Sequence, residues 1–352
     1  MPKLKNTLFS VLDKVRLTQL NMTGLQNFAA ILTFHHVSPG RFGKIISHLS
    51  KHYNVLPLSG LLDLVFLNKP VPSGMLSRPG RPFLAITFDD GYKNTFEQAY
   101  PVLKKHNLHA TVFLITDLIN SDSFLPAWWD VIEAAFILSR SSPEWRGLLR
   151  DEASRAGIKP VVSNHVEFSD MLKTLPPEKR AEIVDNLRNR LESSGIPSHI
   201  ERNFRFASWS DVSRCSDVFD YGSHTSSHPL LDQLPFREQL RQLKLSSETI
   251  KKKTGMKPEI LCYPNGNFNS DTIRAAKTAG YRYAVTTRIG WLPLAPTSRR
   301  KNAKPNPLAV PRISINPADS LAVAKAKING VFYKLKKLSK KPEKDDKSHG
   351  VD

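Results

Sequence analysis

The stretch FLAITFDDGY, residues 83–92, runs from an apolar segment typical of a buried strand into two adjacent carboxylates and a glycine. A second polar segment, HTSSHP at residues 224–229, adds two imidazoles. A divalent metal that keeps one position open for water is commonly held by two imidazoles and one carboxylate. Together the two segments predict a hydrolytic metal site with Asp90, His224 and His228 as ligands.

Each pattern also has a plainer interpretation. Imidazoles four positions apart lie on one face of a helical turn, but an isolated HxxxH pattern more often marks ordinary loop residues. Asp90 beside Gly91 is equally suited to a turn. The metal interpretation is favoured here because paired carboxylates end an expected strand upstream of the histidines in the same chain.

Three motifs together resemble one known family. They are TFDDG at residues 87–91, HTSSHP at 224–229 and a partial third match, CYPNG, at 262–266. In this order they resemble the polysaccharide deacetylases with a NodB homology domain, carbohydrate esterase family 4, over roughly residues 31–315. The resemblance implies a distorted (β/α) barrel with fewer strands than the ordinary eight. It also implies metal-dependent removal of N-acetyl groups from amino sugars, with release of acetate.

Short apolar runs bounded by turn residues alternate with helical patterns, which indicates βα units and a parallel sheet. Seven such runs suit a closed α/β barrel, and with the resemblance they predict a distorted (β/α)7 barrel with a helical insertion. Residues at the C-terminal ends of barrel strands converge on one face, where chemistry is usually housed. The expected strands are residues 31–36, 84–88, 110–115, 219–223, 259–263, 283–287 and 310–315.

The expected barrel, residues 31–315, is interrupted by a long insertion at about 117–210. A proline in the first turn and a glycine just past the end predict a helix over residues 177–193 within it. A second helix is predicted from Trp129 to about Leu138.

Two further segments lie outside the expected barrel. Residues 1–30 are expected to form an N-terminal extension, with a short amphipathic helix over residues 6–20 that lies on the body of the protein or on a membrane. Residues 316–352 are expected to form a basic C-terminal helix followed by a disordered tail.

Asp89 is the candidate general base, because it remains as a second carboxylate beside the metal and can accept a proton from bound water. Two adjacent carboxylates repel one another unless a cation lies beside them, and the metal supplies that cation. Asn265 follows Pro264 where the family carries an aromatic residue whose backbone N–H helps to stabilise the oxyanion. The sequence departs from the family at Cys262, where the resemblance implies an arginine that orients the base. Arg312 in the last expected strand is a candidate substitute, and equally an ordinary surface arginine.

A general acid is also missing from its family position. The resemblance implies a histidine after the last barrel strand, but the only histidine after His228 is His349 in the tail. His35 ends the first expected strand and is the candidate acid, with His36 as a weaker candidate that points the opposite way. The alternative is that His35 packs at the rim of the barrel.

Aromatic side chains offer flat faces against which a sugar ring can stack. The pair of tryptophans in the insertion is a candidate platform, although such a pair at the start of a helix more often belongs to a core. The candidate set for substrate binding is Tyr92, Trp128, Trp129, Tyr263 and Pro264.

The composition of the chain limits its size class, its disulfide content and the charge of its partners. The 352 residues, 40% of them hydrophobic, are enough for one large barrel, and Cys215 and Cys262 are too few for a disulfide framework. Lys and Arg exceed Asp and Glu by 51 to 32, which gives a net charge of +19 and predicts an anionic partner or surface. Much of the excess lies near the C-terminus, at Lys325, Lys327, Lys334, Lys336, Lys337, Lys340, Lys341, Lys344 and Lys347.

This basic segment lacks the interleaved aromatic residues of a nucleic-acid stacking surface, so no nucleic-acid partner is predicted. Anionic lipid, or phosphate on a lipid-linked glycan substrate, is the preferred partner, and a solvated basic tail is the alternative. Residues 1–16 show no convincing signal peptide, because charged residues break their apolar run. The expected location is the cytoplasm, with peripheral contact at the inner face of a membrane.

The predicted function is therefore hydrolysis of N-acetyl groups on the amino sugars of a polysaccharide or glycan precursor. Zinc is the preferred divalent metal, and cobalt, nickel and iron accept the same ligands. A carbohydrate-binding pseudoenzyme on the same barrel is the alternative. The missing arginine and terminal histidine support this alternative, and the intact carboxylates and histidines of the first two motifs oppose it.

Overall fold

The structure is a computed structural model. It describes residues 5, 7, 9, 10, 13, 27–71, 80–119, 127–158, 164–294 and 305–339. The chain divides into two compact units. One is a barrel unit of residues 1–91, 95–119 and 209–352, and the other is a helical unit of residues 92–94 and 120–208.

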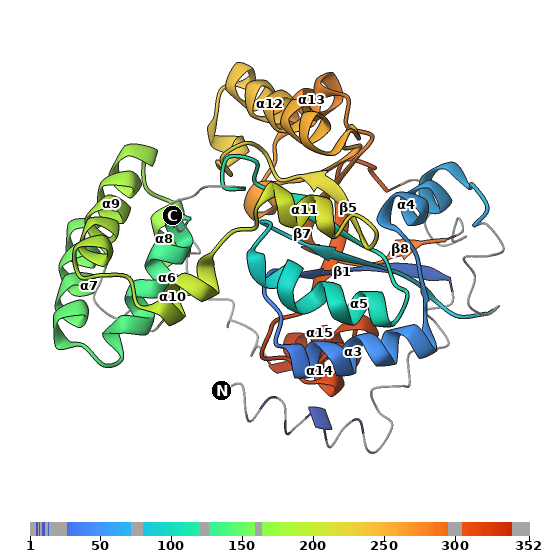
Figure 1. Cartoon of the computed structure of the whole chain (residues 1–352), viewed down its shortest axis with the longest axis horizontal. Helices are drawn as coiled ribbons and strands as arrows, with labels where there is room; N and C mark the ends of the chain where they lie inside the picture. The colour runs from blue at the N-terminus through green and yellow to red at the C-terminus, as the bar shows by residue number, and fades with distance from the viewer. Residues whose placement is uncertain are drawn as a thin grey trace, which may run out of the picture. The chain divides into compact units, whose positions relative to one another are not determined.

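Seven parallel strands close into a barrel in the first unit (Figure 1). Their order around the barrel is β1-β3-β4-β5-β6-β7-β9, and β9 pairs with β1 to complete the ring. All seven expected strands are confirmed, as β1 (Phe28–Phe34), β3 (Phe83–Phe88), β4 (Ala110–Leu114), β5 (Phe219–Ser223), β6 (Ile260–Cys262), β7 (Tyr283–Ile289) and β9 (Val310–Ser314).

Two short strands extend the sheet beyond the ring. β2 (Asn54–Val55) pairs in parallel with β3, and β8 (Leu292–Pro293) pairs antiparallel with β1. β1, β3, β4 and β6 are almost wholly buried on both faces, which is why they appear in the sequence as apolar runs rather than alternating ones. Phe34 and Phe88 end the neighbouring strands β1 and β3, and their rings stack at 5.5 Å.

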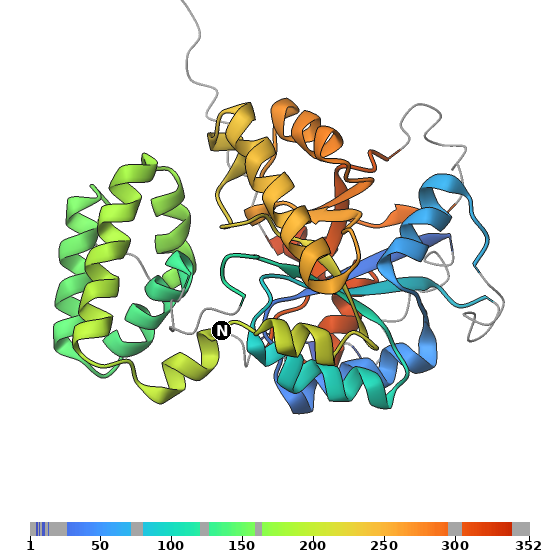
Figure 2. The ribbon, with the colours of Figure 1, turned by 45° about the horizontal axis from the view of Figure 1, so that its top comes forward.

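Helices surround the ring in the barrel unit, as Figure 2 shows from a second direction. They are α3 (Pro39–His52), α4 (Leu58–Leu67), α5 (Tyr100–Lys105), α11 (Trp209–Arg214), α12 (Phe236–Thr254), α13 (Ser270–Ala279), α14 (Leu321–Ile328) and α15 (Val331–Ser339). Three single turns complete the unit, at Thr95–Ala99 (η2), Leu231–Gln233 (η3) and Pro264–Gly266 (η4). No described helix has both the length and the apolar character to cross a membrane.

The helix predicted over residues 6–20 falls mostly outside the described residues. The described residues of this segment are helical, and Phe9 packs on the buried face of α14. Lys5 bonds Asp319 at 2.7 Å, and Asp13 bonds Lys325 at 2.5 Å. The predicted disordered tail lies outside the described residues.

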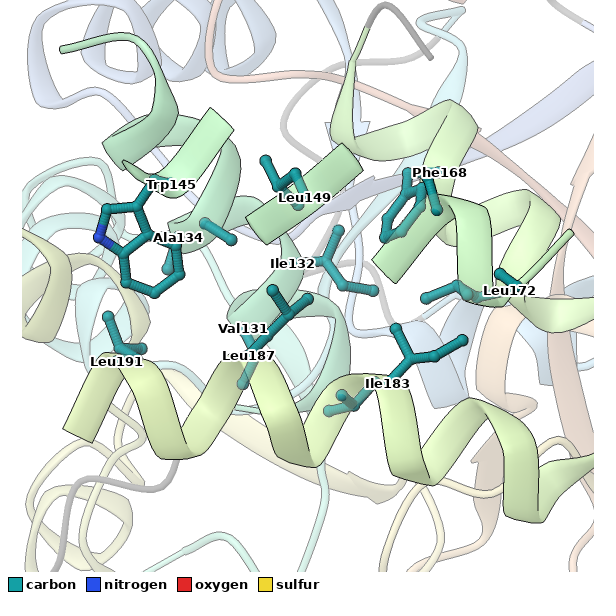
Figure 3. Packing of buried hydrophobic residues seen from close by; sticks show 14 of the residues in the cluster. Val131, Ile132, Ala134, Trp145, Leu149, Phe168, Leu172, Ile183, Leu187 and Leu191 are labelled. Carbon is teal, nitrogen blue, oxygen red and sulfur yellow. The ribbon is translucent and has the colours of Figure 1, made fainter. Parts of the chain in front are cut away.

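The second unit is a bundle of helices with its own core (Figure 3). The helix predicted over residues 177–193 is confirmed with those bounds, and the one predicted from Trp129 to Leu138 lies within α6. Three further helices were not predicted. The described residues of this unit form α6 (Trp128–Ser139), α7 (Pro143–Arg155), α8 (His165–Lys173), α9 (Pro177–Ser193) and α10 (Ser198–Phe204).

Candidate active site

Two carboxylates follow β3 at the end of the barrel where the strands terminate. Asp89 and Asp90 are 2% and 3% exposed, so both lie inside the protein. The turn that holds them is tight, because Asp90 and Gly91 both have positive φ, at 72° and 86°. A Cβ added to Gly91 would lie 2.9 Å from Ile119, which explains why glycine stands here.

The histidine segment follows β5 and is not helical. Thr225 and His228 adopt left-handed backbone conformations with φ of 69° and 58°, which corrects the expected helical turn. The Thr225 hydroxyl accepts a hydrogen bond from the backbone N–H of His228 at 2.9 Å and closes the loop. Such strained residues cluster where the surrounding structure holds them for a function.

One imidazole is fixed in a defined tautomer. His224 Nδ1 lies 2.8 Å from the carbonyl oxygen of Cys262, and a carbonyl can only accept, so Nδ1 carries the proton. In the neutral form of the ring, the lone pair is then on Nε2, the nitrogen that lies 3.3 Å from Asp90. A histidine that ligates a metal is typically oriented in this way by a second bond.

Asp90, His224 and His228 come together as predicted. His224 Nε2 and His228 Nε2 lie 3.3 and 3.9 Å from Asp90 Oδ1, and the three ligand atoms lie within 4.8 Å of one another. The imidazole rings stand nearly perpendicular, at 81°, with their centroids 4.6 Å apart. Two imidazole nitrogens and one carboxylate oxygen in this arrangement fit a divalent transition metal such as zinc.

Asp89 is held by Arg312 in a bidentate ion pair. Arg312 Nη1 and Nη2 donate to the two Asp89 carboxylate oxygens at 2.7 Å each, and Arg312 is 1% exposed. The structure thus places Arg312 beside the candidate base and not on the surface. Burial by itself raises the pKa of Asp89, but the guanidinium outweighs it and holds that pKa well below its usual range.

The remaining donors of Arg312 are also satisfied. They bond the Thr286 carbonyl and the hydroxyls of Thr33 and Thr87 at 3.0 to 3.2 Å. Arg312 Nη2 also lies 3.2 Å from the Cys262 sulfur. The small side chain at Cys262 therefore borders the guanidinium that β9 brings in, at the motif position where the resemblance implied an arginine.

His35 follows β1 and reaches the same carboxylate. Its Nε2 lies 3.8 Å from Asp89 Oδ2, and its side chain is 48% exposed, so it stands between the buried base and solvent. The pKa of neighbouring His36 is lowered to about 4 by burial and then by His35, which leaves His36 neutral near pH 7.

Asn265 lies in the turn η4 after β6, with a left-handed backbone at φ 57°. Its carbonyl accepts a bond from Thr287 at 3.1 Å. Gly266 follows with φ of 76°, and a Cβ there would lie 2.1 Å from the Thr287 hydroxyl. The chain thus passes close to β7, and this close approach fixes the backbone of Asn265.

The arrangement agrees with a comparison of sequences. The profile of the family described as "Polysaccharide deacetylase" matches residues 77–186 and 193–284, more than half of the chain. The chain belongs to this family. The curated protein YxkH of Bacillus subtilis, named for the same family, is 22% identical over 261 residues, which are 74% of this chain and 64% of YxkH. The chain thus spans somewhat less than two thirds of that relative.

Solved structures show the same fold. The Streptococcus pyogenes deacetylase PplD in complex with acetate is 17% identical with a TM-score of 0.52, and the match covers 85% of this chain and 97% of PplD. IcaB from Ammonifex degensii is 15% identical with a TM-score of 0.52, over 86% and 96% of the two chains. At these identities the likeness concerns the fold.

Two residues that were predicted to bind substrate, Tyr263 and Pro264, are buried. Tyr263 is 0% exposed, its hydroxyl donates to the Leu308 carbonyl, and its ring stacks on Phe268 at 5.1 Å. Pro264 beside it is also buried. The prediction that these side chains line the substrate is therefore wrong for the structure as it stands, because the core encloses them.

Tyr92 and the tryptophans belong to the helical unit. The Tyr92 hydroxyl donates to Asp130 at 2.8 Å and accepts from the Trp129 indole at 2.8 Å, and Tyr92 is 1% exposed. Tyr92 is therefore an internal anchor and not a substrate contact. Trp128 is partly buried against the helical core, with the Arg180 guanidinium 5.6 Å from its ring, and its contact with substrate stays a prediction.

Some contributors to the site were missed at the sequence level. Thr33 and Thr87 bond Arg312, and each is a polar residue inside an apolar run, which is a usable signal. The Cys262 carbonyl that orients His224 has no such signal, because any residue supplies a carbonyl.

Proposed function

We propose that this protein is a metal-dependent N-deacetylase that hydrolyses the acetamide of N-acetylated amino sugars in a polysaccharide or glycan precursor. The observation that carries the proposal is an ionised buried carboxylate, Asp89, directly beside the three converging ligand atoms of Asp90, His224 and His228. A divalent metal held by those three residues would polarise the acetamide and lower the pKa of water from about 15.7 towards about 7.

Asp89 is proposed to accept the proton of the attacking water. The Arg312 pair keeps Asp89 ionised and fixes both of its oxygens, each of which has a further lone pair for a proton. An adjacent carboxylate would otherwise make this ionised form costly inside the barrel. Arg312 is thus proposed as a positioning residue for the base.

The leaving group needs a proton, because an amine anion does not leave. His35 is proposed as the donor, since it lies beside Asp89 and is open to solvent on its other side. Water adds to the acetyl carbon, the C–N bond breaks, and the products are acetate and a free amine. The backbone N–H of Asn265 is proposed to stabilise the negative charge on the acetyl oxygen.

These contacts weaken the case for a pseudoenzyme. That alternative rested on an arginine and a histidine that are absent from their family positions. Arg312 of β9 lies 2.7 Å from Asp89, and His35, just after β1, lies 3.8 Å from it. An arginine and a histidine thus reach Asp89 from positions other than those of the family motifs.

The test is acetate release from N-acetylglucosamine oligomers by the metal-loaded protein, with bound metal quantified in each variant. Asp89→Asn is expected to keep the metal and to lose turnover. His224→Ala is expected to lose both. An active Asp89→Asn enzyme contradicts the proposed base, and a parent protein that binds no metal contradicts the proposed centre.

A further inference from the structure

An open groove of about 900 Å³ runs between α3 and α5 on the outside of the barrel unit. The two helices lie side by side in both views (Figures 1 and 2). The groove begins at Pro39 and Gly40, a few residues beyond His35 at the end of β1. It therefore starts near the end of the barrel that carries the carboxylates and leads away from it.

The charges that line this groove are all positive. Lys44 and Lys51 project from α3 and Lys105 from α5, and all three residues are exposed. None of the lining residues in the described part of the chain is acidic. Among the described residues, no ion pair is formed by these three lysines, whereas Lys104 next to Lys105 bonds Asp217 at 3.0 Å.

Two histidines of α3 also line the groove, and burial disfavours their charged forms. His48 and His52 lie one helical turn apart with their ring centroids at 4.4 Å. Burial, and then His52, lowers the pKa of His48 to about 4, and the pKa of His52 is lowered as well. Asp13, whose carboxylate raises the pKa of His48 slightly against these effects, is bonded to Lys325. The lysines therefore supply the positive potential.

The spacing of the charges indicates an extended ligand. Lys44 and Lys51 are seven residues apart on one face of α3, about 10 Å along its axis. A single phosphate or carboxylate does not span that distance, but a linear chain with repeated anionic groups does. The surface is concave, which suits a chain better than a flat bilayer.

The lining also distinguishes between classes of polyanion. A groove for single-stranded nucleic acid combines positive charge with aromatic side chains on which bases stack. No Phe, Tyr or Trp lines this groove. The lysine and serine side chains of this open groove can pair with the carboxylates and hydroxyls of an acidic glycan.

We propose that the groove between α3 and α5 binds an anionic glycan chain and leads it toward the carboxylate end of the barrel. This inference rests on the proposed function and deepens it, because it names an acidic polysaccharide as the substrate class.

The test is equilibrium binding of a fluorescent oligogalacturonate to the full chain at fixed ionic strength. Replacement of Lys44, Lys51 and Lys105 by Gln is expected to weaken binding about tenfold, since each exposed ion pair contributes modestly. The matched control replaces the exposed lysines Lys251, Lys252 and Lys277 by Gln, which removes the same charge outside the groove. This control is expected to bind as the parent does.

Several outcomes would overturn the proposal. They are equal weakening in both triple variants, no binding by the parent, or groove-dependent binding of single-stranded DNA or phosphatidylglycerol vesicles that exceeds binding of the glycan. Acetate release from neutral N-acetylglucosamine oligomers is measured separately. Release by the parent together with failed oligogalacturonate binding refutes only the groove, whereas groove-dependent binding without release counts against the proposed deacetylase and not against the groove.

Discussion

At the scale of single residues, Arg312 carries a positive charge inside the barrel, and Asp89 balances it. The folded-state pKa of Asp89 is depressed, so the pair stabilises the protein above the unfolded pKa of about 3.9. That contribution is lost as the pH falls through the folded pKa.

Arg312→Gln should lower the free energy of unfolding by about 3–5 kcal/mol at pH 7, because it leaves a buried carboxylate without its cation. The deficit should narrow between pH 7 and pH 4, because burial raises the pKa of Asp89 once its cation is gone and the folded variant then takes up a proton. Urea unfolding at the two pH values measures both effects.

A second arginine provides the control for this change. Arg282 also bonds two carboxylates, Asp63 and Glu259, but its side chain is 36% exposed. Arg282→Gln should cost no more than about 1 kcal/mol, because solvent screens such pairs. Equal losses of unfolding free energy in the two variants would mean that burial does not make the Arg312 pair more stabilising than an exposed one.

His35→Ala should lower the rate of acetate release from N-acetylated sugars about 10²–10⁴-fold, the usual contribution of a general acid. Hydrolysis of p-nitrophenyl acetate should fall only slightly, because p-nitrophenolate leaves without a proton. His36→Ala is the neighbouring control and should keep most of the amide activity. Equal losses on both substrates would argue that His35 does not serve as the acid.

At the scale of elements, the turn η4 carries Asn265 and depends on Gly266. Gly266→Ala should destabilise the protein by about 1–3 kcal/mol, because the new methyl group collides with Thr287 and the backbone has positive φ. It should also lower kcat, since Asn265 shifts with the turn. Thermal unfolding and steady-state kinetics measure the two effects.

Gly60 in α4 is the matched glycine, because nothing lies within 4 Å of an added Cβ. Gly60→Ala should be neutral or stabilise the protein by up to about 1 kcal/mol, since alanine favours a helix. A Gly266→Ala protein that behaves like Gly60→Ala would show that the turn is tolerant.

The elements of the barrel could be predicted because a doubly buried strand has a simple signature, an apolar run between turns. β2 and β8, each of two residues, are too short to show one. α7 did carry a signal, since Ser142 caps it and Pro143 begins it. The helical turn at the histidines was wrong because the HxxxH spacing does not reveal the left-handed backbone at Thr225.

The side chains of the site also divide into those that the sequence predicts and those that it does not. Asp90, His224 and His228 could be predicted from local motifs, and the Arg312 contact could only be raised as one of two alternatives. Arg312 and Asp89 are 223 positions apart, and only the closed barrel brings them together. Tyr263 and Tyr92 were misjudged because a sequence does not show which aromatic side chains the core encloses.

At the scale of the whole molecule, the C-terminal lysines are not all free to meet a membrane. Lys327 is buried and bonds Asp319 at 2.5 Å, and Lys325 bonds Asp13. The proposed membrane contact therefore falls to lysines beyond these two, several of which lie outside the described residues.

Removal of residues 325–352 should lower the unfolding free energy by about 3 kcal/mol or more, because Asp319 loses Lys327 and the core loses Ile328. A chain that ends after Ser339 keeps both and serves as the control in thermal unfolding. Binding to anionic vesicles is then compared between the parent and the chain that ends after Ser339. Equal melting temperatures for both truncated proteins would contradict the structural role of α14.

The position of Arg312 in β9 also has a consequence in time. During synthesis the ribosome releases the carboxylates, the histidines and most of the ring before it releases the strand that holds the guanidinium. A nascent chain that ends before β9 holds Asp89 without its guanidinium partner, so the carboxylate is not yet oriented. The proposed deacetylase activity would therefore begin only when the last barrel strand docks, so that completion of the fold and onset of activity would coincide.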